Sequence, residues 1–413
     1  MLMKKILSFL VIFLALMGGN ALAETFEPAA QHAIVVESNS GKILYEKNAQ
    51  KAVPVSSLTK LLTIYMVYKQ IDSGKLTWET PVDISDYAYA LTTDYSINNV
   101  PLDARRYTVK ELVEVTLVQN ANSSAIALAE HIGGSESKFV DMMRKQLSDW
   151  GISDATIVNA SGLPNTYLGE NRYPDSDEND KNKLSAYDLA LIAYHLVNDF
   201  PDVLRLASTQ SLSFEGYTLY NSNYMLENMF YYRPGVDGLL LGTSKVSGDS
   251  FVTTSTENKI PVISVTLRAK ESSSNPYAVF EVTNSLLDYV QTNFKQKTLL
   301  KKGQSYKDSS IPVTDGKSDK VSSVAADDLK VVSKVSTDLK ETIETVDTVK
   351  KLTAPVTAGQ PVGVANFKDP DKVGNGYLAQ EPSVQMVTKS DIQADFFLKI
   401  WWNHFVNYVN ENL

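Results

Sequence analysis

The chain has 413 residues, of which 43% are hydrophobic, and this is enough for a folded core and for two or more domains. Its net charge of -9 argues against a nucleic-acid partner, because such proteins present a basic surface. The absence of cysteine excludes disulfide bonds and thiol chemistry.

The N-terminus has the pattern of a secretory signal. A basic start precedes an apolar run over residues 6–17, and a small-residue cleavage site ends at Ala23. This order predicts a signal peptide over residues 1–23 and a mature protein outside the cytoplasm. An uncleaved membrane anchor is the alternative interpretation.

Residues 24–295 are expected to form one domain that mixes strands and helices. Two hairpins are predicted, one from residues 32–37 with 42–46 and one from residues 251–256 with 260–268. Helical patterns occupy the ranges 107–118, 124–132, 139–150, 184–197 and 277–294. Strands at both ends of a helical middle predict an α/β domain with an inserted helical subdomain.

Ser57 and Lys60 begin a helical pattern of their own. Apolar residues recur at i, i+3, i+4 and i+7 from Leu58, so Ser57 and Lys60 should share one helix face. A serine hydroxyl becomes a nucleophile when a base takes its proton. A lysine is such a base when burial leaves its amine neutral. The alternative is a helix cap followed by a surface lysine.

The C-terminal third changes in composition. Short alternating runs punctuated by Gly and Pro predict a small all-β domain, a β-sandwich, over residues 296–390. Residues 391–413 read as an amphipathic helix that contains Trp401 and Trp402. We expect this helix to lie in the interface of a membrane surface. Docking on the protein's own core is the alternative.

Several landmarks together resemble one enzyme family, the serine D-alanyl-D-alanine carboxypeptidases, which are low-molecular-mass penicillin-binding proteins. They are the segments 41–46, 159–164, 185–190 and 235–239, together with the Ser-x-x-Lys pair. The resemblance covers nearly the whole mature chain. It implies a β-lactamase/transpeptidase-like α/β domain, with an antiparallel sheet and a helical subdomain, followed by a small all-β domain and a C-terminal amphipathic helix.

The family's second motif, S-x-N, is altered here. The matching positions are Asn120-Ala121-Asn122, so that Asn122 stands for the asparagine that grips the substrate amide. Asn120 replaces the serine that relays a proton to the leaving group, and an amide cannot shuttle a proton at neutral pH. Asn120 is therefore interpreted either as a cap or turn residue or as a substrate contact. Ser123 lies three residues further along and cannot simply take over.

The third motif, K-T-G, is altered more strongly. Leu240 and Leu241 stand at the lysine and threonine positions, and only Gly242 is kept. In the family this lysine helps to hold the terminal carboxylate of the substrate, for which a leucine offers no partner. A charged hydrogen bond is worth about 1.5–3 kcal/mol, so the loss should be felt. The alternative for Leu240 and Leu241 is a plain buried strand.

The residues after Gly242 are candidates for the missing functions. By resemblance, Thr243 lends a backbone N–H to the oxyanion hole, a role that needs no particular side chain. Lys245 lies five residues after Leu240, an odd number, and should face the other side of a strand. Ser244 has the right parity and is a weak donor.

The resemblance predicts a serine D-Ala-D-Ala carboxypeptidase of peptidoglycan maturation, on the outer face of the cell membrane. Ser57 would attack the penultimate D-Ala carbonyl, Lys60 would accept its proton, and stem peptides ending in D-Ala-D-Ala and β-lactams would be the ligands. The altered motifs predict impaired turnover. The alternative is an inactive paralogue that binds cell-wall peptide or a protein partner.

Other chemistries have weaker support in the sequence. A β-lactamase would need an additional glutamate for deacylation, and none is evident. The four histidines lie in predicted strands or helices and the sequence gives no signal of an acid paired with them, so we expect structural roles for them. The acidic run 175–180 lacks the glycine and the closing glutamate of a calcium loop. No cofactor and no metal are expected.

Overall fold

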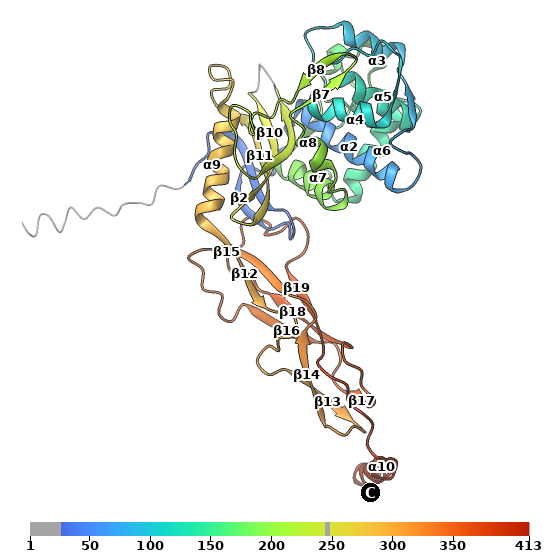
Figure 1. Cartoon of the computed structure of the whole chain (residues 1–413), viewed down its shortest axis with the longest axis vertical. Coiled ribbons are helices and arrows are strands. Elements are labelled where there is room, and N and C mark those ends of the chain that lie inside the picture. The colour runs from blue at the N-terminus through green and yellow to red at the C-terminus, as the bar shows by residue number, and fades with distance from the viewer. Residues whose placement is uncertain (1–25, 244–247, 413) are drawn as a thin grey trace, which may run out of the picture.

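The structure is a computed structural model that describes residues 26–243 and 248–412. The predicted signal peptide, Ser244 and Lys245 lie outside these residues. The molecule is elongated, with a head that contains most of the helices, a stalk of strands, and helix α10 at the far end (Figure 1).

A five-stranded antiparallel sheet forms the centre of the head, with the strand order β2-β1-β11-β10-β9. Its strands are β1 (Ala30–Glu37), β2 (Ile43–Lys47), β9 (Val236–Gly242), β10 (Ser250–Glu257) and β11 (Ile260–Ala269). Both predicted hairpins are therefore confirmed, and they pair with each other through β1 and β11. Strand β9 lies at an edge of the sheet.

Helix α9 (Ala278–Asn293) covers one face of the sheet, and the helical subdomain covers the other. Both faces are covered because successive side chains of β1 point to opposite sides of the sheet. Ile34 and Val36 join the core of the helical subdomain, whereas Ala33 and Val35 pack with the α9 side. A two-sided sheet of this kind needs apolar residues at successive positions, as β1 has.

The helical subdomain is built between β2 and β9. Its helices are η1 (Ser56–Thr59), α2 (Lys60–Asp72), α3 (Asp86–Ala90), η2 (Leu91–Thr93), α4 (Val109–Val118), α5 (Asn122–Gly133), α6 (Glu136–Asp149), η3 (Asn165–Tyr167), η4 (Gly169–Asn171), α7 (Ala186–Asp199) and α8 (Val203–Ala207). Short strand pairs connect them: β3 (Val53–Pro54) with β6 (Lys183–Leu184), β4 (Pro81–Asp83) with β5 (Arg106–Thr108), and β7 (Ser211–Phe214) with β8 (Tyr217–Tyr220).

The ends of α4 and α5 follow from their sequence. A capping box begins α4, because Thr108 and Glu111 each bond the other's backbone N–H. Helix α5 begins at Asn122, two residues before the predicted start, and Gly134 closes it in the left-handed conformation with φ 74°. The earlier start makes Asn122 a helical residue with a fixed direction.

The stalk is β-rich, as predicted. Its strands are β12 (Phe294–Leu300), β13 (Ser310–Thr314), β14 (Lys320–Ala325), β15 (Leu329–Lys334), β16 (Ile343–Asp347), β17 (Leu352–Thr353), β18 (Pro361–Phe367) and β19 (Ser383–Thr388). β12 pairs with β15, and the other six form a sheet in the order β16-β18-β19-β14-β13-β17. β18 is an inner strand of this sheet, because it pairs with β16 on one side and with β19 on the other.

A buried ion pair joins the head to the stalk. Lys42, next to β2, is 1% exposed, and its Nζ lies 2.7 Å from Asp369 Oδ2 of the stalk. The same amine donates to the carbonyl of Val332, and Tyr377 donates to Asp369 at 2.7 Å. Each buried charge is thus neutralised and hydrogen-bonded, which is what makes its burial tolerable.

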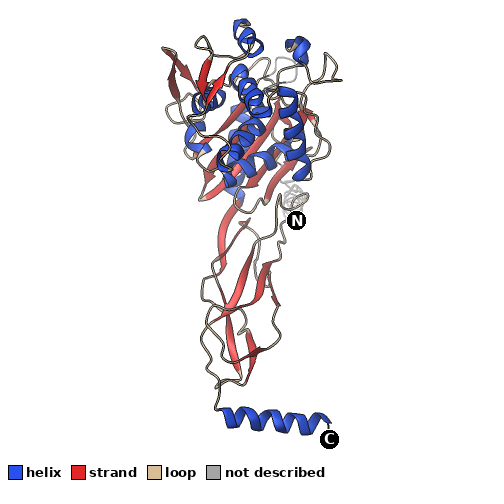
Figure 2. Ribbon diagram, turned by 90° about the vertical axis from the view of Figure 1, so that its right-hand side faces the viewer, coloured by secondary structure: helices blue, strands red, loops and turns tan. Residues whose placement is uncertain are grey.

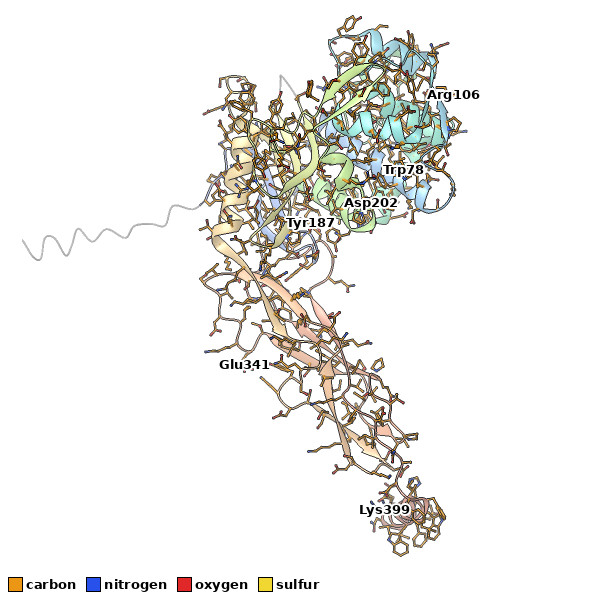
Figure 3. All side chains as sticks on the ribbon, in the orientation of Figure 1. Trp78, Arg106, Tyr187, Asp202, Glu341 and Lys399 are labelled. Carbon is orange, nitrogen blue, oxygen red and sulfur yellow. The ribbon has the colours of Figure 1, made fainter. Side chains whose placement is uncertain are left out.

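The C-terminal helix α10 (Phe397–Asn412) begins six residues after the predicted start. The reason is that Ile392 forms a bridge with Val356 and packs on the stalk core. None of the α10 residues is buried, and the helix runs sideways from the lower end of the stalk (Figure 2), which it contacts through His404 and Asp315 at 2.8 Å. Lys399 marks it in Figure 3, at the opposite end of the molecule from Trp78 and Arg106 of the head. No described helix is both long and apolar enough to span a membrane.

Candidate active site

Ser57 lies on the 3-10 helix η1, at the point where the chain enters α2. Lys60 is the first residue of α2 and is fully buried, whereas Ser57 is partly exposed. Lys60 Nζ is 3.1 Å from Ser57 Oγ. The two groups therefore meet as the spacing predicted, although a tight 3-10 turn rather than the α-helix itself brings them together.

Three groups surround the Lys60 amine. Besides Ser57 Oγ, the amine lies 2.7 Å from Asn122 Oδ1 and 2.9 Å from the carbonyl oxygen of Ser161. No carboxylate is among these partners. Burial lowers the pKa of Lys60 to about 7, because the charged form loses its hydration without gaining a counter-ion.

The hydrogen-bond inventory fixes the direction of this amine. A neutral amine has two N–H donors and one lone pair. Asn122 Oδ1 and the Ser161 carbonyl can only accept, so they take the two N–H groups. The lone pair of Lys60 is left for the Ser57 hydroxyl. This is the geometry of a base that can remove the hydroxyl proton.

The orientation of the Asn122 amide is settled by its second contact. Asn122 Nδ2 donates to the carbonyl of Asn98 at 2.8 Å, which turns Oδ1 toward Lys60. Asn99 Oδ1 in turn accepts from the backbone N–H groups of Asn122 and Ser123 at 3.1 and 2.7 Å. Asn98 and Asn99 support the site but were not found by sequence reasoning, because nothing in their local pattern marks them.

A loop at residues 159–163 supports the other side of Lys60. Thr63 of α2 donates to the carbonyl of Ala160 at 2.6 Å, which fastens the loop to the helix. Gly162 has φ +86°, and a Cβ there would lie 1.9 Å from the Ser56 carbonyl oxygen. Only glycine fits, because the loop touches the backbone of η1. The Ser161 carbonyl was missed as a site group, although Gly162 in the 159–164 landmark was a usable signal.

Glu136 lies beneath this loop. It is 7% exposed and accepts from the backbone N–H of Ala160 at 2.8 Å and from the Tyr87 hydroxyl at 3.1 Å. Burial raises the pKa of Glu136 to about 7. Glu136 therefore titrates near the same pH as Lys60 and acts on the loop that holds the Lys60 amine.

Asn120 connects the helical subdomain to the sheet. Its backbone is left-handed, with φ 61°, a conformation that asparagine tolerates better than most residues. Its side chain is 1% exposed, and Nδ2 donates to the carbonyl of Leu241 on β9 at 2.7 Å. Within the described residues, Asn120 Oδ1 has no partner. Asn120 is thus a turn residue, and it occupies a backbone acceptor on the edge strand.

The residues of the third motif lie at the end of β9 beside η1. Leu240 is 1% exposed and belongs to the core shared with the helical subdomain. This is the environment expected of a residue in a buried strand. A Cβ on Gly242 would lie 3.0 Å from Leu58 Cγ and 3.3 Å from the Val55 carbonyl, so glycine lets β9 approach η1. Thr243 follows the strand and is exposed.

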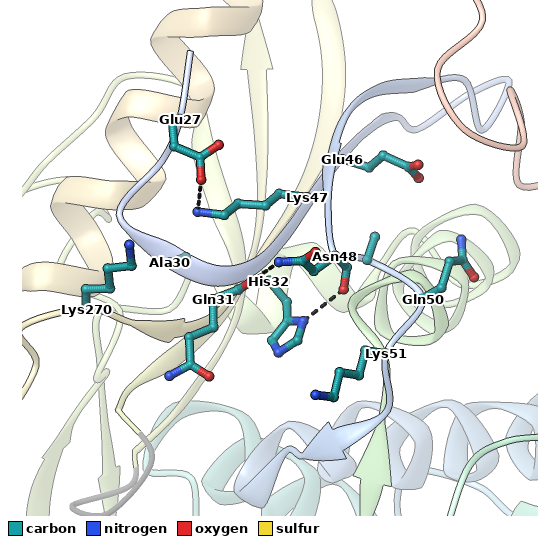
Figure 4. Close-up of a pocket in the computed structure, with 11 residues that line it drawn as sticks. Glu27, Ala30, Gln31, His32, Glu46, Lys47, Asn48, Gln50, Lys51 and Lys270 are labelled. Atoms are coloured by element: carbon teal, nitrogen blue, oxygen red, sulfur yellow. Dashed lines mark hydrogen bonds and ion pairs between the residues drawn. The ribbon is translucent and has the colours of Figure 1, made fainter. Parts of the chain in front are cut away.

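An open hollow lies elsewhere on the head, at the ends of β1 and β2 (Figure 4). His32 is 5% exposed there and bonds the carbonyl of Asn48 through Nδ1 at 2.8 Å. Lys47 lies 2.5 Å from Glu27 on the rim. Ser57, Lys60 and Asn120 do not line this hollow. Among the described residues, no group of three His, Asp or Glu side chains could hold a metal ion.

The site combines a partly exposed serine, a buried lysine without a carboxylate partner, and an adjacent edge strand of an α/β sheet. Together these features define a class of protein. It is the class of serine acyl-transfer proteins that use lysine as the base. Residues 20–271 match the D-alanyl-D-alanine carboxypeptidase family, and residues 294–394 match the C-terminal domain of penicillin-binding protein 5. The chain belongs to the serine-type D-alanyl-D-alanine carboxypeptidases, the low-molecular-mass penicillin-binding proteins of peptidoglycan maturation.

Three relatives illustrate the likeness. A crystal structure of a peptidoglycan synthesis regulatory factor (PBP3) from Streptococcus pneumoniae is 48% identical, covers 89% of this chain and 100% of that chain, and has a TM-score of 0.84. D-alanyl-D-alanine carboxypeptidase DacF of Bacillus subtilis is 25% identical over 96% of both chains. Penicillin-binding protein D2 from Listeria monocytogenes in its ampicillin-bound form is 27% identical, covers 64% of this chain and 98% of that chain, and has a TM-score of 0.52.

Proposed function

We propose that this chain forms an acyl-enzyme on Ser57, with Lys60 as the base, from stem peptides ending in D-Ala-D-Ala and from β-lactams. The observation that carries the proposal is the Lys60 amine, whose two N–H groups have acceptors and whose lone pair faces Ser57. The ampicillin-bound Listeria relative supports the β-lactam part. Asn122 would grip the substrate amide, and the Thr243 N–H would serve the oxyanion hole.

We further propose that turnover of peptide substrates is impaired. Leu240 ends in an apolar core and offers no charge to a terminal carboxylate. Without a charged hydrogen bond worth about 1.5–3 kcal/mol, the carboxylate would bind more weakly. Asn120 cannot relay a proton, and loss of such a relay costs about 10²–10⁴ in rate. A strained β-lactam depends less on both groups, so its acylation should survive better.

A second function, binding of wall peptide without turnover, is considered because one contact hinders productive placement of a peptide. Asn120 Nδ2 occupies the carbonyl of Leu241 on the edge strand. A peptide that pairs with this edge would need the same acceptor. While Asn120 holds this acceptor, a bound peptide would lack one contact to the edge strand and would be poorly placed for attack by Ser57.

Labelling with a fluorescent penicillin tests the proposed nucleophile. We expect one label per chain, located on the peptide that contains Ser57, and no label in Ser57→Ala. Ser56→Ala is the matched control, because Ser56 is the adjacent hydroxyl on η1 and should not be needed. Labelling that persists in Ser57→Ala would refute the proposal.

Two variants at Asn120 separate the functions. Asn120→Gly keeps the left-handed backbone and frees the Leu241 carbonyl, whereas Asn120→Ser also restores a hydroxyl. If the missing relay limits turnover, D-Ala release should rise in Asn120→Ser and not in Asn120→Gly. If blocking of the edge strand limits binding, both variants should bind a D-Ala-D-Ala peptide more tightly than the parent.

We also propose that the chain divides into domains at residues 24–295 and 296–390, and that α10 holds it to the outer face of the membrane. The exposed aromatic residues of α10 support the membrane contact: Phe397, Trp401, Trp402, Phe405 and Tyr408 are 47–67% exposed. Anionic vesicles should bring down the mature chain but not a form that ends at residue 390. Equal sedimentation of the two forms would contradict this attachment.

A further inference from the structure

An exposed aromatic surface lies on the α9 side of the head. It consists of Tyr224, Phe230, Tyr231, Tyr232 and Tyr277, and we call it the aromatic surface. Phe230 is 84% exposed, Tyr232 49% and Tyr224 39%. Clustered apolar rings at a surface mark a binding site more often than isolated ones do.

The rings form a continuous series from the core outward. Phe280 of α9 contacts both Tyr224 and Tyr231, with ring centroids 5.6 and 5.8 Å apart. Tyr231 contacts Tyr277 at 5.2 Å, and Phe230 contacts Tyr277 at 5.9 Å. Packing against a buried ring holds the outer rings in place, so a ligand would meet a preformed surface.

Hydrogen bonds also fix the loop that carries these rings. The backbone N–H of Tyr231 donates to the carbonyl of Tyr224 at 2.8 Å, and that of Arg233 donates to Met225 at 3.0 Å. The Arg233 side chain forms ion pairs with Glu257 and Asp288, both at 2.8 Å. Few conformational degrees of freedom remain to be lost on binding.

The aromatic surface and the edge strand of the candidate active site pack on one apolar cluster. Tyr231, Tyr277 and Leu241 pack on the same apolar cluster at the α9 face of the sheet. The backbone carbonyl of Leu241 is the group that Asn120 contacts. A ligand lying on the rings would therefore be on the α9 side of the edge strand that ends at the Ser57 site.

We propose that the aromatic surface binds the glycan chain of the cell wall, the N-acetylated amino-sugar polymer that carries the stem peptides. This inference rests on the proposed peptide-binding function of the neighbouring site. The C–H faces of pyranose rings pack on aromatic rings, and polar groups on the rim are available for hydroxyl and acetamido groups. These are Asn275 and the exposed carboxylate of Glu281, which accepts from Asn275 Nδ2 at 3.0 Å and from the Tyr231 hydroxyl at 3.3 Å and keeps lone pairs for a further donor.

A lipid surface is a less suitable occupant. Helix α10 lies at the far end of the stalk from the head that carries α9 (Figure 1). If α10 rests on the membrane, the aromatic surface is held away from it, at the level where wall polymer is found. A glycan whose stem peptide enters the Ser57 site would contact both sites at once, which raises the overall affinity.

Binding of a β-1,4-linked N-acetylglucosamine hexamer to the mature full-length chain tests this site, with calorimetry as the readout. We expect Phe230→Ala to weaken binding roughly two- to tenfold, the loss of one aromatic contact, and Phe230→Trp to preserve it. Tyr217→Ala is the matched control, because Tyr217 on β8 is 61% exposed and lies outside the aromatic surface.

Penicillin labelling of Ser57 is measured on the same proteins. Normal labelling with no hexamer binding, or with binding unchanged in Phe230→Ala, overturns the glycan site and leaves the proposed function intact. Loss of labelling in the parent would instead contradict the proposed function. Weaker vesicle binding in Phe230→Ala, without an effect on hexamer binding, would assign the surface to lipid and also overturn the proposal.

Discussion

Acylation of Ser57 should depend on pH in a way that an ordinary lysine could not produce. Burial lowers the pKa of Lys60 to about 7, so the neutral fraction rises about tenfold between pH 6 and pH 8 and then levels off. A lysine with the usual pKa near 10.4 would give a rate that climbs about tenfold per pH unit throughout this range. A plateau in the labelling rate above pH 8 therefore distinguishes a lysine with a lowered pKa from an ordinary one.

The assay is the second-order rate constant for labelling by a fluorescent penicillin, measured by rapid quench at constant ionic strength. Lys60→Met is the reference variant, because methionine fills the buried site and supplies no base. We expect its labelling rate constant to be lower than that of the parent by a factor of about 10²–10⁴ and to be independent of pH. A Lys60→Met protein that labels at the parent rate would refute the assignment of the base.

Glu136 must be separated from Lys60, because burial also raises its pKa to about 7 and it bonds the loop that holds the Lys60 amine. In Glu136→Gln the pH profile of labelling should keep its shape. If the labelling rate of the parent rises between about pH 6 and 8 and that of Glu136→Gln does not, the titrating group is Glu136 and the assignment of the pH dependence to Lys60 is wrong.

Three further predictions concern stability and geometry. Folding raises the pKa of Glu136 to about 7, so protonation of Glu136 stabilises the folded state fully below pH 4.5, and this stabilisation is lost as pH rises to 7. In urea titrations, the unfolding free energy of the parent should therefore fall over this range by about 3 kcal/mol relative to that of Glu136→Gln. Asp369→Asn should lower the unfolding free energy by about 3 kcal/mol, because it leaves the buried Lys42 charge unpaired; a change below about 0.5 kcal/mol would contradict the buried ion pair. Gly162→Ala should slow penicillin labelling about 100-fold, because its Cβ displaces the Ser56 carbonyl beside Ser57, and normal labelling would show that η1 tolerates the shift.

Local patterns were sufficient to predict most elements and the first motif. The alternation along β1 and the helical period after Leu58 depend on near neighbours in the sequence, and both hairpins and α2 formed as expected. The Ser57–Lys60 contact is of the same kind, because the two residues are only three positions apart in the sequence.

The remaining parts of the site depend on contacts between distant segments. The carbonyl that Asn120 bonds lies 121 residues away on β9, and Asn98 reaches Asn122 from a loop without a regular pattern. Ile392 was expected on the C-terminal helix but pairs with Val356, so the helix begins later. Such contacts are decided by tertiary packing, which periodicity does not encode.

The most direct measurement is D-Ala release from a peptide ending in D-Ala-D-Ala, compared between the parent and the triple variant Asn120→Ser, Leu240→Lys, Leu241→Thr. We expect slow release by the parent and a clear increase in the triple variant, with penicillin labelling of Ser57 in both. Release by the parent that already equals that of the triple variant would show that the substitutions in the second and third motifs do not limit this protein.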